Sequence, residues 1–320
     1  YADFYQLFFN ESTIDYAKLY PQFERRLALF EAGPKNSPYY LYCIAVSHLH
    51  QSLIGIRFEK NIEAALDFRK AYVTFKENKK AFPNFTQGDV YYGLMTSMIG
   101  TIPKGYQWMA NVLGLSGKIA EGNALVLKYL NSKDEFSLRA RNEALFIYPY
   151  LVMNLESNEE KAFDFLQSTA YDFKKNHLLA YMGVNLYLNH QHSAKALNIV
   201  QELENTDAYL QLPFWQYEIG YAYIYELKLE KAQKAFSEFV TTFKGKFYVK
   251  DALEKLSWIA YLQGDMKKAM AYRNNILTIG SQITDADKLA FQNAKKTRSE
   301  EHTSELQSHH DLVCRLLLEK

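Results

Sequence analysis

The feature that most constrains the fold of this chain is a small residue that recurs at the interval of one helical hairpin. Ala162, Ala196, Ala232 and Ala269 follow one another at intervals of 34, 36 and 37 residues. Each lies early in a stretch whose apolar residues recur at three- and four-residue steps, the period of an amphipathic helix. A small residue at a fixed place lets two helices approach closely. The spacing therefore predicts a repeated pair of helices.

The best single unit covers residues 214–243. Gly220 lies twelve residues before Ala232, and Phe236 lies four residues after it. This order resembles the small, Ala and aromatic positions of the 34-residue tetratricopeptide (TPR) repeat. The neighbouring units are degenerate, because the next one has Arg273 in the aromatic place. An earlier copy is predicted with Ala65 and Phe68 as its small and aromatic residues.

The few glycines and prolines, and the helix-start signals, also favour helices. The 320 residues include only 14 Gly and 7 Pro, and no convincing alternating strand is present. Ser37 followed by Pro38 is typical of a helix start. We expect an all-α fold: a single TPR-like array of αα-hairpins over residues 1–297. The spacing is interrupted by an irregular insert near 86–122, which contains Pro103.

Composition excludes some classes of function. Lys and Arg number 37 and Asp and Glu number 36, so the net charge is +1, and no nucleic-acid partner is expected. The longest apolar run, 144–153, has ten residues, which is too short to span a membrane. A membrane span is therefore not predicted either.

The two ends of the chain read as non-natural. Residues 298–308 match the translation of a common sequencing adapter, so we treat 298–320 as a non-native tail and exclude it. Cys43 is then the remaining cysteine, and no internal disulfide is expected. Tyr1 already lies inside an amphipathic pattern, from which we expect a longer natural N-terminus.

Residues 88–122 carry a resemblance to known proteins. Their glycines and aromatics resemble the signature block of the tetratricopeptide repeat protein 39 family of eukaryotes. They are more similar still to exported TPR proteins of Bacteroidetes. The shared pattern is a Gly-Thr-Ile-Pro segment, a Tyr-x-Trp pair and a Leu-Gly-x-x-Gly turn, here Gly100, Pro103, Tyr106, Trp108, Gly114, Gly117 and Gly122. The resemblance covers about residues 1–130. It implies a helical-repeat protein of the periplasm or envelope, without established chemistry and with a mainly structural role for these residues. An export leader is not visible.

The sequence offers no convincing catalytic or metal site. The run Gly114–Lys118 lacks the first glycine and the Ser or Thr of a phosphate-binding loop. The pairs His48/His50 and His190/His192 are two residues apart, so on a helix the members of a pair would face different ways. We therefore predict no enzyme, no metal and no cofactor.

The preferred function is a protein-interaction scaffold. Aromatic residues at helical steps would line the concave face of the array and hold a peptide or protein partner. These residues are Phe214, Tyr217, Tyr221, Tyr225, Trp258, Tyr261 and Tyr187. The same spacing is also that of a helix core, so both interpretations remain open.

The alternative function is binding of a lipid or small ligand. An apolar pocket would lie at the 100–122 insert and be lined by Trp108, Met109 and Leu113. The sequence identifies neither the partner nor the oligomeric state.

Overall fold

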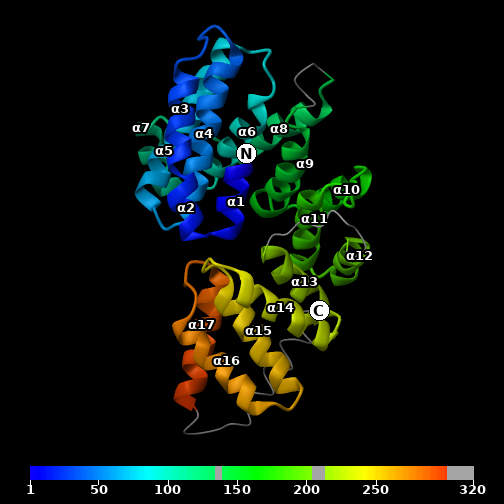
Figure 1. The fold of residues 1–320 in the computed structure, drawn as a ribbon. Coiled ribbons are helices and arrows are strands. Elements are labelled where there is room, and N and C mark those ends of the chain that lie inside the picture. The colour runs from blue at the N-terminus through cyan, green and yellow to red at the C-terminus, as the bar shows by residue number, and fades with distance from the viewer. Residues whose placement is uncertain (134–138, 204–212, 301–320) are drawn as a thin grey trace. The chain divides into compact units, whose positions relative to one another are not determined.

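The structure is a computed structural model, and it describes residues 1–133, 139–203 and 213–300, the last four without their side chains. Within those ranges the chain forms helices and turns and no strand (Figure 1). The predicted all-α class is confirmed. Of the predicted non-native tail, residues 298–300 form the end of the last helix, and 301–320 lie outside the described residues.

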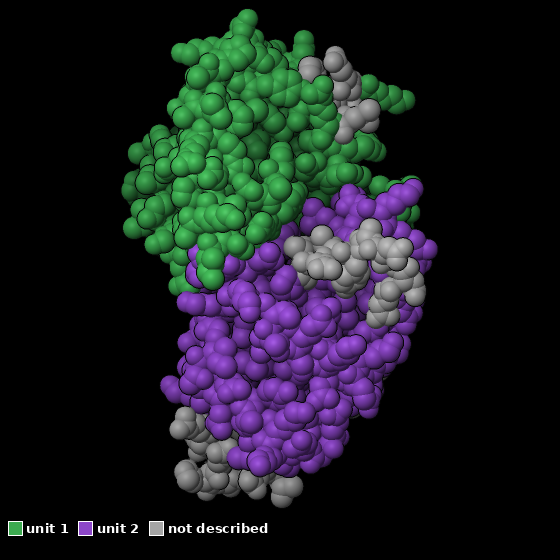
Figure 2. All heavy atoms as spheres, viewed as in Figure 1, with its two compact units in different colours: residues 1–8, 14–172 green, residues 9–13, 173–320 purple. Residues whose placement is uncertain are grey.

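The described residues fall into two compact units, which Figure 2 shows in two colours. Unit 1 comprises residues 1–8 and 14–172, and unit 2 comprises residues 9–13 and 173–320. Each unit is described by itself below.

Unit 1 begins with three helices and a long hairpin and continues through shorter elements. Its elements are α1 (Ala2–Asn10), α2 (Thr13–Leu19), α3 (Pro21–Glu31), α4 (Pro38–Arg57), α5 (Asn61–Ala81), α6 (Gly88–Gly100), the 3-10 turn η1 (Lys104–Tyr106), α7 (Gln107–Val112), α8 (Ile119–Asn131), α9 (Arg141–Tyr150), the π-helical turn η2 (Leu151–Leu155) and α10 (Glu159–Ser168). The residues at the junction of α1 and α2, 9–13, group with unit 2.

Unit 2 is a succession of hairpins closed by one further helix. Its helices are α11 (His177–Asn189), α12 (Ser193–Leu203), α13 (Pro213–Tyr225), α14 (Leu229–Thr242), α15 (Val249–Leu262), α16 (Met266–Thr278) and α17 (Asp285–Glu300). The core is aromatic, with Phe214, Trp215, Phe236 and Phe239 fully buried.

The hairpins share one kind of connection. Three residues join the helices in α4–α5, α11–α12, α13–α14 and α15–α16, and also η2 to α10. The middle residue has positive φ in every case: Glu59, Ser157, Gln191, Leu227 and Gly264. In four of them the next N–H donates to the carbonyl five residues earlier, as Lys228 does to Tyr223. This is the bond that closes a helix through a left-handed residue.

The recurrent alanines follow this connection at a constant distance. Each stands four residues after the last connecting residue, where Ala162, Ala196, Ala232 and Ala269 are all buried. In the α4–α5 hairpin the equivalent residue is Ala64, whose Cβ would lie 2.9 Å from a Cβ added at Gly55. Ala65, the residue predicted for this place, is exposed, so that prediction was wrong by one position.

The start of α4 and the end of α9 show the local structure that their Ser and Pro residues favour. Ser37 caps α4, since its side chain accepts a hydrogen bond from the Tyr39 N–H at 3.3 Å. Pro149 stands in the last turn of α9, and the π-helical turn η2 follows it directly. Because proline has no N–H, the regular ladder is interrupted there, and the wider turn accommodates the change.

The predicted irregular insert corresponds to α6, η1, α7 and α8. Helices α6 and α8 pack closely on each other, while η1 and α7 form an excursion between them. Residues 113–118 lead from α7 back to the start of α8. This excursion encloses the site described next.

Candidate functional site

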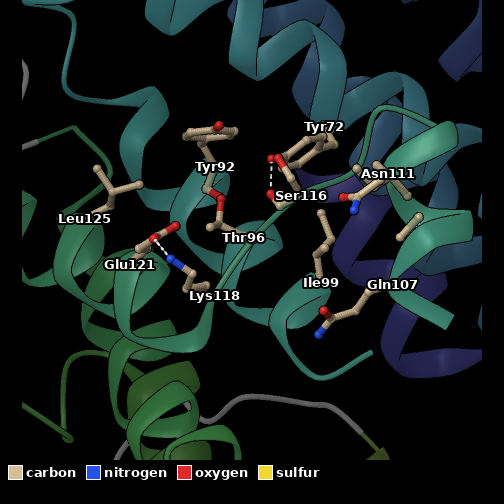
Figure 3. Close-up of a pocket in the computed structure, with 13 residues that line it drawn as sticks. Tyr72, Tyr92, Thr96, Ile99, Gln107, Asn111, Ser116, Lys118, Glu121 and Leu125 are labelled. Atoms are coloured by element: carbon tan, nitrogen blue, oxygen red, sulfur yellow. Dashed lines mark hydrogen bonds and ion pairs between the residues drawn. The ribbon is translucent and has the colours of Figure 1, made fainter. Parts of the chain in front are cut away.

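A pocket of about 550 Å³ lies in unit 1, among α5, α6, α7 and the start of α8 (Figure 3). Tyr72 comes from α5, and Tyr92, Thr96 and Ile99 come from α6. The other walls are residues of 107–118, together with Glu121 and Leu125 of α8. A volume of this size is typical of a site for a small ligand or a short segment of chain.

Glycines at the α6–α8 crossing set one boundary of the pocket. A Cβ added at Gly93 would lie only 2.7 Å from the carbonyl oxygen of Gly122. An added Cβ at Gly117 would likewise collide with the carbonyl oxygen of Thr96, a residue that lines the pocket. Side chains at these places would push α8 and its leading segment away from α6. The glycines of the predicted signature, Gly100, Gly117 and Gly122, therefore have a packing role.

Tyrosines connect α5 and α6 to the returning segment. The hydroxyl of Tyr72 donates a hydrogen bond to the backbone carbonyl of Ser116. The ring of Tyr72 lies 5.4 Å from the ring of Tyr92, measured between centroids. Burial raises the pKa of Tyr92, so its hydroxyl stays protonated at neutral pH. The wall thus offers two aromatic rings and the Tyr92 hydroxyl to a ligand.

The charge of the lining is balanced. Among the described lining residues, Lys118 and Glu121 carry charge, and their side chains form an ion pair at 2.9 Å (Figure 3). Both side chains are exposed, so the pair contributes little to stability. It also leaves the pocket without a net charge. A strongly charged ligand therefore has no complementary partner here.

Helix α7 presents its polar side to the pocket. Gln107, Ala110 and Asn111 line it, and they lie three and four residues apart on one face. The amide of Gln107 donates to the carbonyl of Ile102 at 3.3 Å. Asn111 is exposed, so its amide is open to solvent or to a ligand. An amide both donates and accepts, so Asn111 can hydrogen-bond a ligand in either sense.

The residues predicted to line an apolar pocket at this insert do not do so. Trp108, Met109 and Leu113 are exposed and are absent from the lining. The prediction of the lining was wrong because α7 faces the pocket with the opposite side. Of the remaining signature residues, Tyr106 and Pro103 are exposed, and Gly114 has positive φ in the turn after α7.

The aromatic residues predicted as a partner groove lie mostly inside unit 2. Phe214, Tyr217, Trp258 and Tyr187 are buried, whereas Tyr221, Tyr225 and Tyr261 are half-buried. Tyr217 stacks edge-on to Tyr221 at 5.1 Å between centroids. They lie on the first helix of three successive hairpins, α11, α13 and α15, but largely as core. Binding of a partner there stays a prediction.

A buried polar cluster that sequence reasoning missed accompanies this stripe. The hydroxyls of Tyr217 and Tyr221 donate to the same carboxylate oxygen of Asp251, at 2.8 and 2.6 Å. The Lys255 ammonium lies 3.6 Å from Asp251 and 3.7 Å from the centroid of the Trp258 ring. Asp251 and Lys255 stand one turn apart on α15, a spacing that could have indicated the ion pair. The charged and hydroxyl groups of the cluster are thus paired with one another inside unit 2.

The histidine pairs do not converge. His48 bonds to Asp67 through Nδ1 at 2.9 Å, while His50 stacks on Phe4 with 4.1 Å between ring centroids. Burial lowers the pKa of His50 to about 3, so it is neutral. No group of three or more His, Cys, Asp or Glu side chains suited to a metal occurs in the part of the chain that the structure describes.

Among the described helices, none combines the length and the apolar character that crossing a membrane requires.

Comparisons with protein-family models, with curated proteins and with solved structures found no match to this chain.

Proposed function

We propose that the protein is a non-catalytic binding protein that holds a short segment of polypeptide in the unit 1 pocket. The observation that carries the proposal is the pocket itself, about 550 Å³ in volume and lined by amides, hydroxyls and aromatic rings without net charge. The class of function is the one predicted from the sequence, but the site differs.

The lining suits the chemistry of a peptide. The Asn111 amide can bond backbone N–H and C=O groups, which need partners when they leave water. The Thr96 hydroxyl donates to the Tyr92 carbonyl at 2.7 Å and can still accept from a peptide N–H. Ile99, Leu115 and Leu125 provide apolar surface for a side chain. A neutral ligand that alternates polar and apolar groups satisfies both parts of the pocket.

We also infer that the hairpins are TPR-like repeats. This inference is supported by the recurring three-residue connection and by the buried alanine four residues after it. Repeats of this type serve as binding scaffolds without chemistry of their own, which agrees with the proposed function.

The proposal is tested by selection of displayed random heptapeptides on the full chain. The wild-type protein is expected to enrich a family of related peptides. Ser116→Phe should abolish the enrichment, because the new ring would occupy the pocket. The position is exposed, and the Ser116 carbonyl that accepts from Tyr72 is retained, so folding should not suffer.

The matched control is Ser168→Phe, an exposed serine at the end of α10 that does not line the pocket. This variant should enrich the same peptides as the wild type. Equal enrichment by Ser116→Phe would contradict the proposal. So would native mass spectra in which a co-purified small molecule occupies wild type but not Ser116→Phe, which would assign the pocket to that molecule.

A further inference from the structure

Helix α7 is amphipathic, but its apolar side faces solvent instead of the protein interior. Its polar residues face the pocket, as described above, whereas its large apolar residues face solvent. Trp108 is 64% exposed and Val112 is 79% exposed, and Tyr106, Met109 and Leu113 are exposed beside them. Five large apolar side chains within eight residues are an uncommon surface for a folded protein. We call these five residues the α7 apolar face.

The α7 apolar face lies on a protrusion. A Cβ added at Gly105 or at Gly114, the glycines on either side of α7, would meet no atom within 4 Å. The closest packing of α7 is with η1, the turn that precedes it, and the pocket separates its inner side from α6. An exposed apolar surface such as this can enter a soft medium without a matching groove.

The segment that carries the face has charges of one sign. No acidic residue occurs between Asp89 and Glu121. Lys104 is exposed at the beginning of the segment, and Arg69 of α5 bonds the Leu113 carbonyl through Nε at 2.7 Å at its end. An anionic surface would therefore meet cations and no opposing carboxylate from this segment.

We propose that the α7 apolar face inserts into the interface of an anionic lipid membrane. A six-residue helix is roughly 9 Å long, so α7 can lie in the plane of the interface as a short patch with its apolar side chains turned toward the lipid. Trp and Tyr favour this interface because they join an apolar ring to a polar tip. The flanking cations, Lys104 and Arg69, favour an anionic lipid surface as the occupant. The inference is independent of the ligand of the pocket.

Vesicle flotation with the full chain tests the proposal. The probes are vesicles of phosphatidylcholine and vesicles of phosphatidylcholine with phosphatidylglycerol. We expect the protein to float with the second kind and its tryptophan emission to shift to shorter wavelength. The shift will report on Trp108, because the other two tryptophans, Trp215 and Trp258, are buried already.

Two sets of variants make the test specific. The double variant Trp108→Ser with Val112→Ser should bind anionic vesicles at least about tenfold more weakly. The control Met266→Ser with Met270→Ser removes an exposed apolar pair with the same four-residue spacing from α16 and should bind like wild type. Lys104→Ala should weaken binding to the anionic vesicles about fivefold.

Two results would overturn the proposal. One is the absence of flotation together with unchanged Trp108 emission. The other is a dimer in light scattering that Trp108→Ser with Val112→Ser dissociates, because a second copy of the chain would then cover the face.

Discussion

Glu218 is a residue of α13 whose carboxyl lies wholly inside unit 2. The Asn185 amide of α11 donates to it at 2.9 Å. Burial raises its pKa from 4.5 to about 7, and the hydrogen bonds from Asn185 and Tyr181 only partly oppose this effect. The folded state therefore favours the protonated carboxyl. In the unfolded chain the same group ionises near its ordinary pKa.

This difference predicts a loss of stability as pH rises. The folded pKa exceeds the unfolded one, so the contribution of Glu218 is complete below about pH 4.5 and lost above about pH 7. Glu218→Gln stays neutral. The stability of this variant relative to wild type, measured as the difference in the free energy of unfolding, should therefore be about 2 kcal/mol greater at pH 8 than at pH 5. Urea unfolding followed by circular dichroism measures this difference.

The control for Glu218→Gln is Glu230→Gln, at an exposed position of α14. Its stability relative to wild type should change little between the two pH values. If Glu218→Gln showed the same advantage at pH 5 and pH 8, Glu218 would be ionised in the folded protein.

At the scale of elements, the α6–α8 crossing positions the pocket. Gly93 of α6 and Gly122 of α8 bring the two backbones together, and Ser97 adds a hydrogen bond from its hydroxyl to Asn123 at 2.8 Å. Asn123 in turn donates to Glu156 at 2.9 Å. The crossing is thus specified by close backbone contact and a buried polar chain.

Gly122→Ala should destabilise the protein by about 1–3 kcal/mol or more, because the added methyl would collide with the Gly93 carbonyl and with Ser97. Gly105→Ala is the matched control, since its added methyl meets nothing within 4 Å. Its stability should be unchanged or slightly increased. Thermal unfolding measures both variants, and equal melting temperatures would contradict the packing role.

The hairpins were more predictable from the sequence than the excursion between α6 and α8. The period of Ala162, Ala196, Ala232 and Ala269 predicts helical pairs because each alanine occupies the same packed place. The orientation of α7 could not be predicted in this way. A helix of six residues has fewer than two turns, which is too short for its sequence to show which side faces the protein. Trp108 is also exposed to solvent, whereas a prediction from sequence places tryptophan in the interior, where it usually lies.

The aromatic stripe shows a second limit of sequence reasoning. Aromatic residues at helical steps have the same pattern in a core and in a groove. The contacts that distinguish a core from a groove join residues that are thirty or more positions apart in the sequence. The hydrogen bonds from Tyr217 and Tyr221 to Asp251 are examples. Only the folded structure brings them together.

At the scale of the whole molecule, the chain forms two compact helical units with separate features. Unit 1 holds the pocket and the α7 apolar face, and unit 2 holds the aromatic core with its buried Asp251–Lys255 pair. The same hairpin connection recurs in both units. We propose ligand binding in unit 1, where the Asn111 amide lines the pocket, rather than at the buried stripe.

The most direct test of this assignment is the dissociation constant of a selected peptide, measured by isothermal titration calorimetry on three proteins. Asn111→Leu removes an amide that lines the pocket, and Asn274→Leu makes the same change at an exposed position of α16. The account predicts that Asn111→Leu weakens binding about tenfold, because a buried peptide group loses its partner. Asn274→Leu should bind like wild type. Equal affinities for all three proteins would contradict the pocket as the binding site.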